Sequence, residues 1–208
     1  MTAAEFHELL LARANTFGIT VTEGTAERLG VYFDLLAHWN RRINLTSLPL
    51  EPPTEQSVDR LFIEPIAASD FVADSVSMWF DLGSGGGSPA IPLNFVRPAK
   101  RLAMVESRER KAAFLREAIR ELQLSNAEVI EARIESLVEQ DGRASNADLV
   151  TVRAVRLSAS LFSHLDSLLR NGGQAILFGT APQRLDLPQG LEIQHVESPL
   201  VVLRRTGV

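Results

Sequence analysis

Cysteine is missing from all 208 residues of the chain. Its absence excludes disulfide bonds, thiolate metal sites and cysteine nucleophiles. Histidine is scarce, and no two histidines stand at the spacing of metal ligands: His7, His38, His164 and His195. We therefore expect no metal site.

Long apolar runs are also missing, so no segment predicts a transmembrane helix. The N-terminus carries Glu5 and Glu8 and lacks the basic start of a signal peptide. The composition, 45% hydrophobic and 23% charged, is that of an ordinary globular protein with one substantial core. We expect a soluble, cytoplasmic monomer that binds no membrane.

Lysine is rare too, because Lys100 and Lys111 are the only two, and the other basic residues are arginines. The formal net charge is −5. Residues 1–78 contain 5 basic and 11 acidic groups, whereas residues 79–208 contain 16 and 15. A nucleic-acid partner would therefore need a local arginine patch. The alternative is that these charges only solvate the surface.

The first 75 residues read as a helical extension. Apolar residues recur at helical spacing in residues 2–17, and the segment from Thr20 to Glu23 has the pattern of a capping box that starts a second helix. One apolar stripe of that helix includes Tyr32 and Trp39. A third helical stretch is expected at about 57–73, with Pro65 kinking or restarting it.

From residue 76 to 208 the pattern changes to short apolar runs separated by amphipathic helices. Helices are expected at about 88–97, 107–122, 133–140 and 158–170. Strands are expected at 78–82, 101–106, 127–131, 147–153, 174–178, 191–197 and 200–205. Alternating strands and helices predict a parallel sheet covered on both faces. We therefore predict an α/β fold with a doubly wound, seven-stranded Rossmann-like sheet, the N-terminal extension packing on this core.

A glycine-rich loop, DLGSGGGS at 81–88, follows the first expected strand and precedes a helix. Gly83, Gly85 and Gly87 stand at alternate positions, which lets the backbone turn sharply and approach a ligand closely. Pro89 suits the first helical position. The alternative is that this loop is only a tight turn between a strand and a helix and binds no ligand.

An acidic residue, Glu106, ends the next strand and can accept both hydroxyls of an adenosine ribose. NAD-binding folds use the same device. S-adenosylmethionine is favoured because Asp81, just ahead of the first glycine, can face the cofactor's ammonium group. The dinucleotide spacing that starts at Gly83 also fails at Ser88. The less strict dinucleotide pattern Gly-x-Gly-x-x-Ala is matched by Gly85, Gly87 and Ala90, so dinucleotide binding remains an alternative.

Several segments, in order along the chain, resemble the RsmG/GidB family of bacterial methyltransferases: WNRRINLT (39–46), DLGSGGGSPAIPL (81–93), ESRERKAAFL (106–115), ARIESL (132–137) and TVRAV (151–155). The resemblance implies transfer of a methyl group from S-adenosylmethionine to N7 of a guanine in the 530 loop of 16S rRNA. It also implies cofactor contacts at Gly83, Ser88, Ile134, Glu135 and Arg153. Trp39 and Asn44 also have structural interpretations, as a core residue and as a helix cap.

Two segments depart from the family pattern in ways that affect the substrate more than the cofactor. Leu61, Glu64 and Pro65 stand where His, Asp and Ser are expected, and Gly179 with Thr180 replaces a Lys-Gly pair. We interpret these changes as a loss of polar groups from the side that faces the substrate.

The expected chemistry needs positioning only and no catalytic acid or base. N7 of guanine has a free lone pair and loses no proton, so alignment with the donor suffices. The Asp/Asn/Ser-Pro-Pro-aromatic motif of amine methyltransferases is missing after the fourth strand. Candidates for contacts with 16S rRNA or the small ribosomal subunit are Arg108, Arg110, Lys111, Arg156 and Asn44. The basic side chains among them could bind RNA phosphates.

Three alternatives remain open at the level of sequence. A small-molecule methyltransferase on the same fold would have a closed apolar pocket. A non-catalytic RNA-binding or ribosome-binding protein could keep the fold. An NAD-dependent oxidoreductase would need a catalytic Tyr, Lys or His in the crevice, and the only tyrosine, Tyr32, lies on the helical stripe.

Overall fold

The computed structural model of the protein describes residues 3–138, 145–179 and 185–207. Within these residues a seven-stranded sheet has the order β3-β2-β1-β4-β5-β7-β6. Its strands are β1 (Met78–Leu82), β2 (Arg101–Glu106), β3 (Ala127–Glu131), β4 (Ala147–Arg153), β5 (Leu169–Phe178), β6 (Leu191–Glu197) and β7 (Leu200–Arg205). The first five strands are parallel, and β7 is antiparallel to both β5 and β6.

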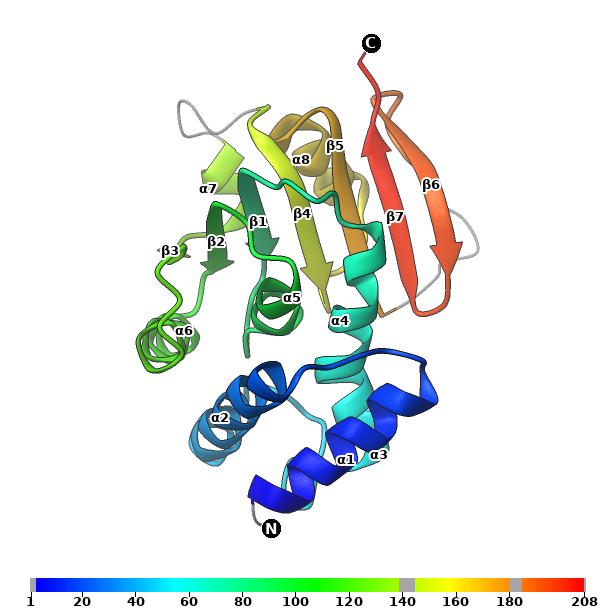
Figure 1. The fold of residues 1–208 in the computed structure, drawn as a ribbon. Helices are drawn as coiled ribbons and strands as arrows, with labels where there is room; N and C mark the ends of the chain where they lie inside the picture. Colours follow the sequence, from blue (N-terminus) through cyan, green and yellow to red (C-terminus); the bar gives the residue numbers. More distant parts are fainter. Residues whose placement is uncertain (1–2, 139–144, 180–184, 208) are drawn as a thin grey trace.

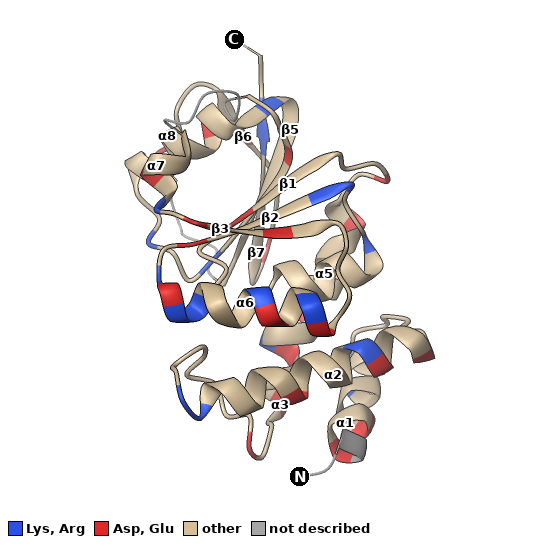
Figure 2. Cartoon of the chain, turned by 90° about the vertical axis from the view of Figure 1, so that its left-hand side faces the viewer, with Lys and Arg blue, Asp and Glu red and all other residues tan. Residues whose placement is uncertain are grey.

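Helices cover both faces of this sheet (Figures 1 and 2). On one face lie α5 (Ala90–Val96) and α6 (Glu109–Glu121), and on the other lie α7 (Ile134–Val138) and α8 (Ala159–Leu168). Successive strand residues alternate between two buried clusters, as the pleat requires: Trp79 belongs to the first cluster and Phe80 to the second. These observations confirm the predicted doubly wound fold.

The N-terminal helices begin beyond the carboxyl ends of the strands, and their last part continues alongside the sheet next to α5 (Figure 1). They are α1 (Ala3–Thr16), α2 (Glu23–Asn40) and a helical run made of α3 (Glu55–Val58), a π-helical turn (Asp59–Ile63), α4 (Glu64–Ala67) and a 3-10 turn (Ala68–Phe71). Phe6 stacks on Phe33 at 4.1 Å, and both rings pack near Phe62. This aromatic group belongs to the same buried cluster as Trp79 of β1.

Three local details differ from the sequence-based predictions. The N-cap of α2 is Thr22, whose hydroxyl accepts from the N–H of Thr25, and not Thr20. Strand β5 begins at Leu169, five residues before the predicted start. Trp39 is half-buried and packs edge-on against Phe114 with ring centres 5.9 Å apart, so it contacts the core from its margin. Residues 139–140 of the predicted helix at 133–140 lie outside the described residues.

The helical run contains a π turn just ahead of Pro65, where the sequence predicted a kink or a restart. The N–H of Glu64 bonds to the carbonyl of Asp59, five residues back, instead of to that of Arg60. The next donor along the run would be Pro65, which has no N–H. The carbonyls of Arg60 and Leu61 therefore lose these helical donors and are available to other parts of the molecule.

Candidate functional site

A cleft of about 660 Å³ lies at the carboxyl ends of the central strands. One wall comes from the glycine loop and from the ends of β2, β4 and β5. The opposite wall comes from the N-terminal extension, through Leu36, the segment 44–48, Arg60 and Leu61. Ligands of doubly wound folds bind in this crevice, so its position marks the candidate site.

The glycine loop has the conformation that its sequence predicts. Gly83, Gly85 and Gly87 have φ values of +73°, +52° and +88°, which side chains other than glycine rarely adopt. At Gly87 a Cβ would also lie 2.6 Å from Cδ1 of Ile91. The chain can therefore turn from β1 into α5 while its backbone lines the cleft.

Glu106 connects the glycine loop to the segment after β2. Its side chain is buried, and Oε2 accepts from the N–H of Gly85 at 3.0 Å while Oε1 accepts from the N–H of Arg108 at 2.9 Å. Each carboxylate oxygen has further acceptor capacity. Glu106 thus lines the cleft in a fixed orientation, and its ribose contact stays a prediction.

Asp81 lies beneath the glycine loop and is buried. Its Oδ1 accepts from the hydroxyl of Thr151 at 2.5 Å, and that hydroxyl accepts from Nε1 of Trp79 at 2.9 Å. Oδ2 has no hydrogen-bond partner within the described part of the chain. Burial raises the pKa of the Asp81 carboxyl to about 6, although the bond from Thr151 opposes the rise. The predicted contact with an ammonium group would use this free oxygen.

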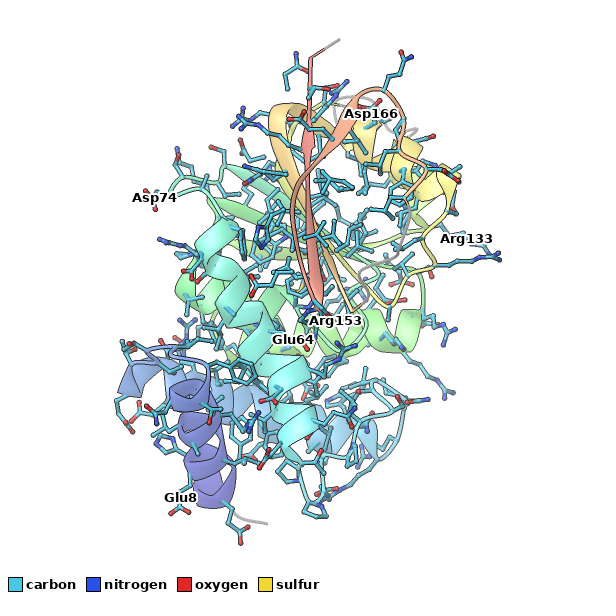
Figure 3. The ribbon with its side chains drawn as sticks, turned by 90° about the vertical axis from the view of Figure 1, so that its right-hand side faces the viewer. Glu8, Glu64, Asp74, Arg133, Arg153 and Asp166 are labelled. Carbon is cyan, nitrogen blue, oxygen red and sulfur yellow. The ribbon has the colours of Figure 1, made fainter. Side chains whose placement is uncertain are left out.

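Arg153 is the centre of a buried polar network at the end of β4 (Figure 3). Its Nη2 pairs with Oε2 of Glu64 at 3.1 Å, and Nη1 donates to the carbonyl of Arg60 and, at 3.2 Å, to the hydroxyl of Ser88. Its guanidinium also lies 4.7 Å from the ring centre of Phe178. Burial lowers the pKa of Arg153 to about 10. Nη1 and Nη2 therefore both bind protein atoms, whereas the buried Nε has no hydrogen-bond partner within the described residues.

This network corrects the interpretation of the departure at Glu64. The side chain supplies a carboxylate to the buried network beside the cleft instead of removing a polar group, and burial raises the pKa of Glu64. Pro65 also contributes, since the Leu61 carbonyl that it frees accepts from the hydroxyl of Ser88 at 2.8 Å. Two of the predicted cofactor contacts, Ser88 and Arg153, thus bond to the helical run of the N-terminal extension.

The remaining candidates fall into two groups. Arg108, Lys111 and Asn44 line the cleft. Arg110 and Arg156 are exposed outside the lining, and on α7 Ile134 is half-buried and Glu135 exposed. Asn44 does not cap α2, because the helix ends at Asn40, whose Oδ1 accepts from the N–H groups of Leu45 and Thr46. Among the departures, Gly179 lines the cleft after β5, and Thr180 lies outside the described residues.

Sequence reasoning missed the contribution of Tyr32. This buried side chain on α2 donates its hydroxyl to the carbonyl of Gly86 at 2.6 Å, so the N-terminal extension holds the glycine loop directly. The sequence did indicate such a contact, because Tyr32 lies on the apolar stripe of its helix and a buried tyrosine hydroxyl usually has a hydrogen-bond partner. The identity of that partner, 54 residues away, was not predictable from spacing.

Two further observations concern only the residues that the structure describes. No three histidine, aspartate or glutamate side chains among them gather closely enough to hold a metal ion. None of their helices combines the length and apolar character that crossing a membrane requires.

Comparisons with known proteins agree with this architecture. The family described as GidB, rRNA small subunit methyltransferase G, matches residues 25–188. Ribosomal RNA small subunit methyltransferase G of Xanthomonas axonopodis pv. citri (strain 306) is 38% identical over 176 residues, which cover 82% of this chain and 77% of the relative. The protein of that name from Neisseria meningitidis serogroup C (strain 053442) is 33% identical over 196 residues, or 93% and 90%.

Among solved structures, a candidate methyltransferase, yhhF from Escherichia coli, has a TM-score of 0.57. It is 15% identical, and the match covers 70% of this chain and 84% of that chain, which shows a shared fold. The extent and identity of the sequence matches decide the family. This chain belongs to the GidB family, rRNA small subunit methyltransferase G.

Proposed function

We propose that this protein transfers the methyl group of S-adenosylmethionine to N7 of a guanine in the 530 loop of 16S rRNA. The observation that carries the proposal is the cleft that unites the glycine loop with Glu106 at the strand ends, in a chain of this family. Glu106 would accept from the ribose hydroxyls, and Oδ2 of Asp81 would accept from the ammonium group. In support, Oδ2 of Asp81 has no hydrogen-bond partner among the described residues, although this oxygen is buried and Asp81 is not one of the residues that line the cleft.

The proposed chemistry needs alignment and no proton transfer from the acceptor atom. S-adenosylmethionine supplies a methyl group already activated by the positive charge of its sulfonium. Among the described residues that line the cleft, Glu106 is the only carboxylate and no histidine is present. Glu106 already accepts two backbone N–H groups, which leaves it as a positioning group. A lone pair such as that on N7 is the acceptor that suits this cleft.

The walls of the cleft also support a polyanionic substrate. Arg60, Arg108 and Lys111 line it, whereas a small apolar substrate would favour a closed apolar pocket. Arg110 and Arg156, exposed outside the lining, and Asn44 within it would extend the contact with RNA. The partner would be 16S rRNA or the small ribosomal subunit, and the protein would act as a cytoplasmic monomer.

Affinity for S-adenosylmethionine should depend on pH through Asp81. With its pKa near 6, the carboxyl is neutral below that pH and ionised above it. If the ionised form pairs with the ammonium group, affinity rises as pH rises, and binding at pH 5 should be about tenfold weaker than at pH 7. Calorimetry at both pH values tests this. Asp81→Asn should bind weakly and without this pH dependence, whereas Asp34→Asn, an exposed control, should behave like the wild type. A wild-type affinity that does not change with pH would remove Asp81 from the ammonium site.

The function itself is tested by methylation. Purified protein, labelled S-adenosylmethionine and either free 16S rRNA or small subunits from a strain lacking the gene should yield one N7-methylguanine, detected by base-selective cleavage. Binding to RNA should weaken with salt, with a log–log slope of about 0.7 per phosphate neutralised. If the modification persists in the deletion strain and neither substrate is methylated, the proposal is wrong. Binding of RNA without turnover would favour the non-catalytic alternative.

A further inference from the structure

The order of the strands gives the cleft two chemically different ends. Glu106 ends β2, the glycine loop follows β1, Arg153 ends β4 and Phe178 ends β5, and these strands are neighbours in that order. If Glu106 binds the ribose, the adenosine lies at the β2 end. The acceptor must then approach from the β4–β5 end, so the residues that line this end face the substrate.

Arg60 reaches this end of the cleft from the N-terminal extension. Its Nη1 pairs with Oε1 of Glu64 at 3.2 Å, and its side chain is 36% exposed. Its Nη2 lies 3.4 Å from the position that a Cβ on Gly179 would take. Within the described part of the chain, Nη2 donates to no acceptor. The guanidinium therefore occupies the space next to the end of β5 that a larger residue at position 179 would restrict.

Glu64 fixes the orientation of this guanidinium. One of its oxygens accepts from Arg60 and the other from Arg153, which is itself bound to Ser88 and to the Phe178 ring. The side chains of Glu64 and Arg153 are only 15% and 14% exposed. A buried pair therefore holds the more exposed Arg60 in place, while the outer donors of Arg60 stay available to a ligand.

We propose that Arg60 binds the target nucleotide, with Nη2 donating to one of its oxygens, and that Glu64 is the positioning residue for this contact. This inference rests on the proposed function. Guanine carries the acceptor O6 beside N7 on the same edge, and a guanidinium matches either that oxygen or a phosphate oxygen. The oxygen belongs to the base or to its phosphate, and the salt dependence of binding distinguishes the two.

The test compares Arg60→Gln with Arg97→Gln. Arg97 is a matched control, because its side chain is 39% exposed, pairs with Asp74 at 3.3 Å and lies outside the cleft lining. Arg60→Gln should lower kcat/KM for small subunits or 16S rRNA by about 10- to 100-fold, the size of a lost charged hydrogen bond. Its affinity for S-adenosylmethionine, measured by calorimetry, should stay within about twofold of the wild type. Arg97→Gln should change neither quantity.

A phosphate contact should also reduce the salt slope of RNA binding by about 0.7, whereas a contact with O6 should leave the slope unchanged. Glu64→Gln should lose part of the same turnover, and Glu64→Asp should restore some of it if orientation is what matters. If Arg60→Gln methylates as well as an active wild type, or loses cofactor affinity in proportion, the assignment of Arg60 is wrong. A wild type inactive on both substrates would instead overturn the proposed function, and this assignment with it.

Discussion

Replacing Glu106 by Ala should weaken S-adenosylmethionine binding by about 1.5–3 kcal/mol, or roughly 10- to 150-fold in Kd. The carboxylate accepts from the N–H groups of Gly85 and Arg108, so the variant loses a proposed ribose contact and also leaves two backbone donors without their partner. Isothermal titration calorimetry measures the change directly. Glu109→Ala is the matched control, because Glu109 is exposed three residues further along in the first turn of α6.

The size of the Glu106 effect also separates the two interpretations of the glycine loop. A tight turn without a ligand would lose some stability in the variant, and no specific affinity would change. An unchanged Kd for S-adenosylmethionine in Glu106→Ala, with the protein still folded, would therefore contradict the ribose role. Titration with NAD in parallel should show no saturable binding if the loop is specific for the methyl donor.

Replacing Arg153 by Met should destabilise the fold by about 3–5 kcal/mol, because Glu64 would keep a buried charge without its main partner. Urea denaturation followed by circular dichroism gives this free energy of unfolding. The control is Arg170→Met, since Arg170 is 53% exposed in its pair with Asp148 and should contribute no more than about 1 kcal/mol. A loss in Arg153→Met no larger than in Arg170→Met would contradict a buried, essential pair.

A second variant and a change of pH test the cause. Glu64→Gln added to Arg153→Met removes the buried charge that has lost its main partner and should recover a large part of the lost stability. Burial raises the pKa of Glu64 above its ordinary value, so its ionised form is penalised in the folded state. In Arg153→Met this penalty applies above the folded pKa and is relieved as pH falls. The deficit should therefore be smaller at pH 5 than at pH 7.5.

The strands were the part of the fold that sequence patterns predicted well. A strand buried on both faces is a short apolar run between turn residues, and MWFDL at 78–82 is such a run, with the same bounds in the structure. Local capping was harder, because Thr20 and Thr22 offer equivalent hydroxyls and tertiary packing selects where α2 begins. The start of β5 was missed because Leu169, where the strand begins, fell within the helix predicted at 158–170.

At the site, residue types were predictable and their partners were not. The glycine loop and Glu106 are adjacent through the order of the strands, which βα alternation implies. The pairing of Arg153 with Glu64, 89 residues apart, depends on how the N-terminal helices pack and has no local signature. The same holds for Arg60, which sequence reasoning did not select. The departure at Glu64 was consequently interpreted as the loss of a polar group facing the substrate, whereas its carboxylate is part of the network.

The bond from Tyr32 to Gly86 has a consequence for protein engineering. A shortened enzyme that began near residue 76 would leave the glycine loop without that donor and without Leu36, which packs against it. It would also expose to water the side of the hydrophobic cluster that Phe6, Phe33 and Phe62 cover. The extension therefore cannot be exchanged as an independent unit between enzymes with different substrates. Redesign of specificity would have to replace single side chains on its inner surface and keep the scaffold whole.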